Sequence, residues 1–228
     1  MATHLDLEEQ EQLDQLKIYW KQYGNLVTWV LIVVLGAYAA WNGWTWWQRQ
    51  QAVKSSAMFD ALDSAAQTGD ADAAARIFAD MKDRYPRTAF TEQAGLLAAK
   101  VQVEKNKPDA AIETLDWVGA HATEDEYRTV ARLRAAGVLL DQKKYDDAIR
   151  QLDAIELDDG SKAFAALVAD RRGDVLLAQG KKDAAKAAYS LAWQSMDETV
   201  SYRRLIEAKL TALGAAPAAS ANAVGAAK

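Results

Sequence analysis

The 228-residue sequence contains no cysteine, only three prolines and only two histidines. Without thiols there can be no disulfide bond, no thiolate metal site and no cysteine nucleophile. The net charge is −5 and lysine and arginine do not cluster with aromatic residues, so we expect no nucleic-acid partner. The scarcity of proline, together with abundant alanine and leucine, favours helix almost everywhere. The composition therefore predicts an all-α protein.

Candidate catalytic groups are scarce as well. His4 and His121 stand in polar surroundings, where a solvated histidine is a better interpretation than a general base or a metal ligand. Carboxylate pairs such as Asp146–Asp147 fall at expected turns and helix starts, where acids complement the helix dipole. The segment 157–162 lacks the alternating acids of a calcium loop, and no glycine-rich phosphate loop occurs. We therefore expect no enzymatic activity, no cofactor and no metal site.

One long uncharged stretch is present near the N-terminus. No charged residue lies between Lys21 and Arg49, and Leu26–Trp44 reads LVTWVLIVVLGAYAAWNGW. A helix of this length spans about 28 Å, close to the hydrocarbon thickness of about 30 Å. Tyrosine and tryptophan gather at both ends, as expected at lipid headgroups. We predict a transmembrane signal anchor over 22–48, preceded by a polar acidic tail over 1–21.

Two alternatives to an anchor must be weighed. A buried helix of a soluble protein rarely runs this long without a charge. A signal peptide cleaved near Ala37–Ala39 would need a short basic n-region, whereas the preceding residues are many and acidic. The orientation is left open by charge, because Lys17 and Lys21 on one side are balanced by Arg49 and Lys54 on the other.

Small residues recur inside the apolar stretch. Gly36 with Ala40, and Ala39 with Gly43, form small-xxx-small pairs of the kind that let membrane helices approach closely. Asn42 adds an amide that would gain from a hydrogen-bonding neighbour. We predict a contact with another membrane helix through Gly36, Ala40, Asn42 and Gly43, with simple accommodation by lipid as the alternative.

A period of 37 residues dominates the rest of the chain. Three kinds of position keep this period: an alanine, a bulky residue four positions later, and a small or apolar residue twelve positions earlier. The members are Ala74, Ala111, Ala148 and Ala185; Phe78, Leu115, Leu152 and Tyr189; and Leu62, Ala99, Ala136 and Gly173. A repeat of this length is a helix pair that cannot bury its own apolar face, so the copies must stack. We predict an α-solenoid of four helix pairs over 51–213.

Short turns and breakers divide this region into helices. The expected helices are Val53–Thr68, Ala71–Tyr85, Thr91–Lys105, Asp109–Val118, Glu126–Gln142, Tyr145–Ile155, Ala163–Gln179 and Lys182–Met196, followed by a capping helix at Glu198–Leu213. The turns within each pair are too short for anything but an antiparallel hairpin. The tail over 214–228 is alanine-rich and lacks apolar bulk, so we expect it to be disordered.

The repeats resemble the tetratricopeptide pattern. In the fourth copy Gly173, Ala185, Tyr189 and Ala192 stand at the signature offsets. The signature tryptophan is missing, the middle copies carry leucine where an aromatic is usual, and the period exceeds the usual 34 residues. The sequence therefore indicates degenerate tetratricopeptide-like repeats.

The whole layout is similar to the YfgM family of bacterial inner-membrane proteins. The resemblance rests on the acidic N-terminal segment, the motif LDQLKIYWKQYGN at Leu13–Asn25, the tryptophan-rich span and the four closed repeats. It implies a single-pass type II protein with its repeats in the periplasm. It also implies association with the SecYEG translocon and with a PpiD-type periplasmic chaperone.

In tetratricopeptide domains the first helix of each pair lines a concave groove. Carrying that register over gives a candidate partner groove formed by Phe59, Leu96, Lys100, Val103, Val130, Leu133, Leu140 and Leu177. A place in the interhelix core is an equally good interpretation of each apolar member. Lys100, Glu104, Asp141, Asp170 and Asp174 are expected at the rim. The lysines and asparagines of a carboxylate clamp are missing from these positions.

These features predict a non-enzymatic, membrane-anchored interaction protein. Its groove would suit an apolar segment of an unfolded exported protein or of a partner domain. Two other interpretations remain open at this stage: a structural organiser of envelope protein assembly, and a membrane-bound regulatory adaptor with its repeats in the cytoplasm.

Overall fold

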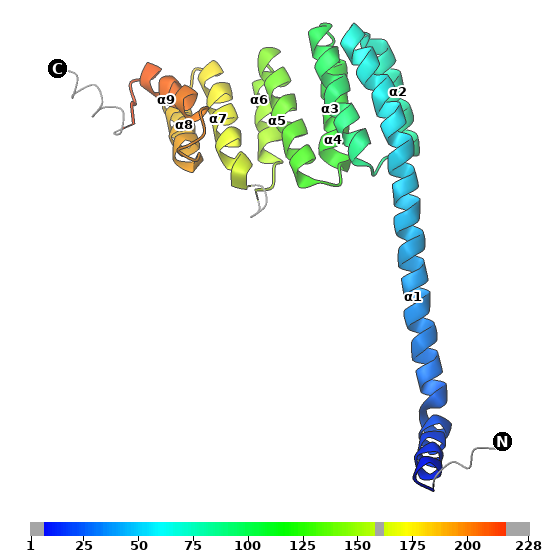
Figure 1. The fold of residues 1–228 in the computed structure, drawn as a ribbon. Coiled ribbons are helices and arrows are strands. Elements are labelled where there is room, and N and C mark those ends of the chain that lie inside the picture. The colour runs from blue at the N-terminus through cyan, green and yellow to red at the C-terminus, as the bar shows by residue number, and fades with distance from the viewer. Residues whose placement is uncertain (1–6, 158–161, 218–228) are drawn as a thin grey trace. The chain divides into compact units, whose positions relative to one another are not determined.

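A computed structural model describes residues 7–157 and 162–217, which contain nine α-helices and no strand. The chain divides into two compact units, Met1–Gln51 and Ala52–Lys228. Three features of the sequence analysis lie wholly or mostly outside the described residues. They are His4, the segment 157–162 that was considered as a calcium loop, and the tail predicted over 214–228. The helices are α1 (Leu7–Thr68), α2 (Ala71–Arg84), α3 (Ala89–Glu104), α4 (Pro108–His121), α5 (Asp125–Asp141), α6 (Tyr145–Asp153), α7 (Lys162–Ala178), α8 (Lys182–Ser195) and α9 (Arg203–Ala212) (Figure 1). The all-α prediction is confirmed.

The first unit consists of the N-terminal part of α1. The helix already begins at Leu7, so most of the segment expected as a polar tail is helical. By length and composition, the stretch Trp20–Thr68 is able to cross a membrane, with a mean hydropathy of 1.7. Only 6% of its most apolar window is buried inside the molecule, which argues against a core helix of a soluble protein.

The second unit contains the four predicted helix pairs. We call the first helix of each pair the A helix (the part of α1 after Ala52, then α3, α5 and α7) and the second the B helix (α2, α4, α6 and α8). The four alanines of the 37-residue period are all fully buried on B helices. The bulky residues four positions later are buried as well. This packing explains the period, because each close helix crossing accepts only a small side chain.

The turns between A and B helices keep the same period. Gly69, Asn106, Lys143 and Gly180 follow one another at intervals of 37 residues, and all have positive φ angles of 70°, 57°, 60° and 78°. A left-handed residue of this kind ends a helix by returning backbone N–H groups to its last carbonyls. The amide of the next residue donates to such a carbonyl in every case, as from Lys144 to Leu139 at 2.9 Å. This conformation reverses the chain sharply and sets each pair antiparallel.

The closing helix is shorter than predicted. It was expected to begin at Glu198, but α9 begins at Arg203. The Asp197 carboxylate accepts hydrogen bonds from both the backbone N–H and the hydroxyl of Thr199, at 2.8 and 2.6 Å. This local turn competes with helix formation in residues 198–202, which precede α9. The helix then buries Ile206 and Leu210 against the last pair.

Candidate protein-binding surface

The eight residues predicted to form the groove lie on four A helices, but their exposure differs. Leu96 is buried in the core, which is its alternative interpretation. Phe59 packs against Phe90, with ring centroids 5.9 Å apart, and Val130 packs on the same core cluster. Leu133 and Leu140 are half-buried against a second cluster. Val103, Leu177 and Lys100 are exposed, the first two by 40% and 37%.

Basic side chains cross from one A helix to the preceding one on this part of the molecule. The Arg134 guanidinium of α5 donates to the Leu96 carbonyl of α3 at 3.3 Å. Arg171 of α7, one period later, lies over Gly137 of α5, where a Cβ would meet its guanidinium at 3.6 Å. Among the described residues, the one acidic partner of Lys100 is Glu104 on its own helix, at 3.8 Å. The surface between the A helices therefore carries both basic and acidic side chains beside its exposed aliphatic residues, because Lys100 and Arg171 each lie within 4 Å of an acid on their own helix.

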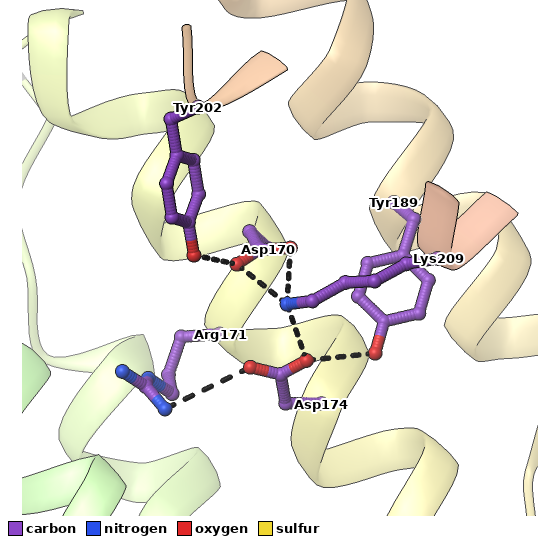
Figure 2. A network of polar contacts seen from close by, with 6 residues as sticks. All are labelled: Asp170, Arg171, Asp174, Tyr189, Tyr202 and Lys209. Atoms are coloured by element: carbon purple, nitrogen blue, oxygen red, sulfur yellow. Dashed lines mark hydrogen bonds and ion pairs between the residues drawn. The ribbon is translucent and has the colours of Figure 1, made fainter. Parts of the chain in front are cut away.

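Asp170 and Asp174, which were predicted at the C-terminal end of the rim, belong instead to a hydrogen-bonded network with Lys209. Asp170 is only 3% exposed, and both of its carboxylate oxygens bind the Lys209 ammonium of α9, at 2.8 and 2.9 Å. The same ammonium donates to Asp174 at 2.7 Å (Figure 2). The prediction that Asp170 belongs to an exposed rim is wrong, because the closing helix covers it.

Two tyrosines complete this network. The Tyr189 hydroxyl donates to Asp174 and the Tyr202 hydroxyl donates to Asp170, each at 2.8 Å (Figure 2). Burial and the hydrogen bond to Asp174 raise the pKa of Tyr189, and burial and the bond to Asp170 raise the pKa of Tyr202 to about 12. Both hydroxyls thus keep their protons at neutral pH. The network fastens α9 to α7 and α8 and has the character of a structural clasp.

A polar ladder joins successive repeats along their turns. Asp72 accepts from Lys107 at 2.7 Å, Asp109 accepts from Lys144 and Gln142 at 3.1 Å each, and Asp146 accepts from Gln179 at 3.4 Å. The hydrogen bond and charge of Lys107 lower the pKa of Asp72, and the bonds from Gln142 and Lys144 lower that of Asp109. The 37-residue spacing of these aspartates was visible in the sequence. Their partners stand 33 or 35 positions later, on the next repeat.

A buried carboxylate also lies between the second and third repeats. Glu92 of α3 is only 1% exposed, and its Oε1 accepts the Thr123 backbone N–H at 2.7 Å. Within residues 7–157 and 162–217, its Oε2 has no hydrogen-bond partner. Burial raises the pKa of this carboxyl above its reference of 4.5, and nearby Glu124 acts in the same direction. The carboxylate thus holds the α4–α5 connection against α3, although burial disfavours its charged form.

Glu92→Gln should flatten the pH dependence of stability. The folded pKa is raised, so the native state binds more protons between the unfolded pKa near 4.5 and the folded pKa. In that window the contribution of Glu92 to stability falls as the pH rises. We expect the loss of unfolding free energy between pH 4.5 and pH 8, measured by urea denaturation, to be smaller in Glu92→Gln than in the parent. Glu113→Gln, an exposed change on α4, serves as control. An unchanged difference would contradict the assignment.

The residues predicted to contact another membrane helix are exposed within their own unit. A Cβ added at Gly36 or at Gly43 would meet nothing within 4 Å. The Asn42 backbone carbonyl accepts a hydrogen bond from the Thr45 hydroxyl at 3.0 Å, and the side chains of Asn42 and Ala40 are exposed. The contact through Gly36, Ala40, Asn42 and Gly43 stays a prediction.

The fold and its repeated contacts define an all-α protein in which an apolar helix is followed, along the chain, by tetratricopeptide-like helix pairs. The chain belongs to the family of tetratricopeptide repeat-like domains, which matches residues 17–215. No solved structure gives a significant match.

Two curated proteins, each called ancillary SecYEG translocon subunit, are similar to the chain. The protein from Haemophilus influenzae is 28% identical over 128 residues, covering 56% of this chain and 62% of the relative. The protein from Neisseria gonorrhoeae is 30% identical over 138 residues, covering 59% of this chain and 64% of the relative. The chain thus spans less than two thirds of each relative. These matches confirm the resemblance to the YfgM family.

Proposed function

We propose that this protein is a membrane-anchored, non-enzymatic ancillary subunit of the SecYEG translocon. The names of the two relatives carry this proposal. The apolar part of α1 supports a single membrane span, and stacked helix pairs present the extended surfaces that repeat proteins use for binding. A span of this kind would hold the repeats beside the channel and raise their local concentration there.

We place the protein in the bacterial inner membrane as a single-pass type II protein with its repeats in the periplasm. There it would link the translocon to a PpiD-type chaperone and to unfolded exported proteins. The exposed aliphatic residues Val103 and Leu177 on the A helices support a surface for such apolar segments.

Site-specific crosslinking in membranes tests this proposal. A photoreactive residue at Leu177 should capture SecYEG subunits, the chaperone or polypeptides in transit, because this side chain is exposed on an A helix. The same residue at Leu191, 57% exposed on the B helix α8, is the matched control and should capture fewer of them.

Other outcomes would point to the alternatives. Capture of folded envelope subunits alone would favour a structural organiser. A reporter fused after Leu213 that is active only in the cytoplasm would favour a regulatory adaptor. Equal capture at Leu177 and Leu191 would contradict the proposed surface.

A further inference from the structure

The closing helix α9 occupies the register of a fifth A helix at the end of the stack (Figure 1). Leu210 lies 37 residues after Gly173 and is buried, like every earlier member of that position. Contacts with the preceding A helix keep their spacing as well. Arg134 donates to a carbonyl 38 residues earlier, and Lys209 donates to a carboxylate 39 residues earlier. No B helix follows α9 in the part of the chain that the structure describes.

One face of α9 is more exposed than the same face of the earlier A helices. Leu205 is 47% exposed, whereas its counterparts at intervals of 37 residues are at most 5% exposed: Val168, Ala131 and Ala94. Ala212 is exposed, whereas its counterparts are buried or half-buried: Val175, Val138 and Val101. In the fourth pair, Val168 lines a small cavity with Ala188 and Leu191 of its own B helix. The B helix of a pair therefore covers this face, and α9 lacks that cover.

The uncovered face of α9 is apolar. Leu205, Ala208 and Ala212 lie at positions i, i+3 and i+7, which places them on one side of the helix, and we call them the outer stripe. All three are exposed. The terminal helix of a solenoid normally turns a polar face to water. An uncovered apolar stripe at this end of the stack indicates a partner.

The outer stripe matches a second copy of itself. Each B helix of this chain runs antiparallel to its A helix and brings a buried alanine to a close crossing. The α9 helix of another copy, set antiparallel on the outer stripe, supplies alanine in the same way. With Ala208 at the centre, Leu205 of one copy lies opposite Ala212 of the other, so a large side chain meets a small one at both ends. A parallel pair would instead set leucine against leucine.

We propose that the outer stripe is a contact surface between two copies of this chain, whose α9 helices pack antiparallel about a two-fold axis beside Ala208. Such an interface is isologous, because each copy contributes the same patch. A ten-residue helix offers much less area than the about 800 Å² per partner of a stable complex. The pair is therefore weak in dilute solution and is favoured where both copies are confined to one membrane. This inference goes beyond the proposed function, which requires only one copy.

Single cysteines test the pair, because the natural chain contains none. The full chain with Ala208→Cys is placed in phosphatidylethanolamine–phosphatidylglycerol vesicles, oxidised mildly and analysed on a non-reducing gel. We expect a disulfide-linked dimer, since cysteines beside a two-fold axis come within the Cβ–Cβ distance of about 4 Å that a disulfide needs. Ala212→Cys, on the same face, is the matched control. Its two copies would stand about 10 Å apart along the helices, so its dimer yield should be at least about fivefold lower.

A mixture of two chains of different size tests the antiparallel register. Leu205→Cys in one chain and Ala212→Cys in the other should give the mixed dimer in preference to either like dimer, because these two positions lie opposite each other. Equal dimer yields from Ala208→Cys and Ala212→Cys, or no dimer from Ala208→Cys, would overturn the proposal.

Further variants identify what covers the outer stripe. Leu205→Asp in the Ala208→Cys chain should lower the dimer yield about tenfold or more, because pairing would bury a charge. Leu191→Asp, at an exposed leucine on α8, should leave the yield unchanged, and equal losses from the two variants would contradict the contact. Removal of residues 218–228 should have no effect. A several-fold rise would identify the chain's own C-terminal segment as the occupant and overturn the proposal.

Thermal unfolding verifies that every variant folds. Crosslinking to SecYEG from Leu177 is a separate readout, so failure of the α9 pair leaves the proposed function standing or falling by itself.

Discussion

Replacing Lys209 by methionine should cost about 3 kcal/mol of unfolding free energy or more, because removing one partner of a buried ion pair leaves an uncompensated charge. The Asp170 side chain is only 4% exposed and receives two of its three hydrogen bonds from this ammonium. Methionine retains much of the aliphatic stem, so the change isolates the loss of the cation. Urea denaturation followed by circular dichroism measures the effect.

The matched control is Lys186→Met on α8. Lys186 stands 3.8 Å from the fully exposed Asp183, and exposed pairs of this kind contribute about 0–1 kcal/mol. Adding Asp170→Asn to Lys209→Met should recover part of the loss, since the buried charge is then gone. A loss below about 1 kcal/mol for Lys209→Met would show that α9 is not fastened by this network.

Gly173→Ala should destabilise the protein by about 2 kcal/mol, although alanine is the better helix former. A Cβ at Gly173 would lie 2.4 Å from the Tyr189 ring. That ring is fully buried, and its hydroxyl is hydrogen-bonded to Asp174, so it has little room to withdraw. Denaturant unfolding at constant pH measures the loss.

The neighbouring repeats supply both a rescue and a control. The second and third copies pair Ala99 with Leu115 and Ala136 with Leu152, whereas the fourth pairs glycine with tyrosine. The double change Gly173→Ala and Tyr189→Leu should therefore recover part of the stability. Gly137→Ala, whose Cβ meets only Arg171 at ordinary distance, should be stabilising by up to about 1 kcal/mol. Equal effects at the two glycines would contradict the close-packing argument.

The sequence was sufficient for the repeats because their period reports backbone and core packing directly. Ala74 and Ala111 lie where B helices closely cross neighbouring helices. Any stack of such helix pairs requires small side chains at these crossings. The start of α9 was misjudged because the Asp197 carboxylate caps a local turn that apolar spacing does not reveal. The burial of Asp170 was missed for another reason: its partner Lys209 is 39 residues away on a helix with no counterpart in the other repeats. Val103 is exposed and Leu96 is buried, although both lie on α3. Their burial depends on which neighbouring helices cover them, and the repeat pattern of the sequence does not reveal this.

The polar ladder has a consequence for how the chain folds. Its bonds join residues 33 or 35 positions apart, so no rung requires the closure of a long loop. Folding of such an array is able to nucleate in one repeat and propagate to the next, which low contact order makes fast. The Lys209 network, formed only after α9 arrives, would then be the closing event, and thermal fraying would begin from the same end.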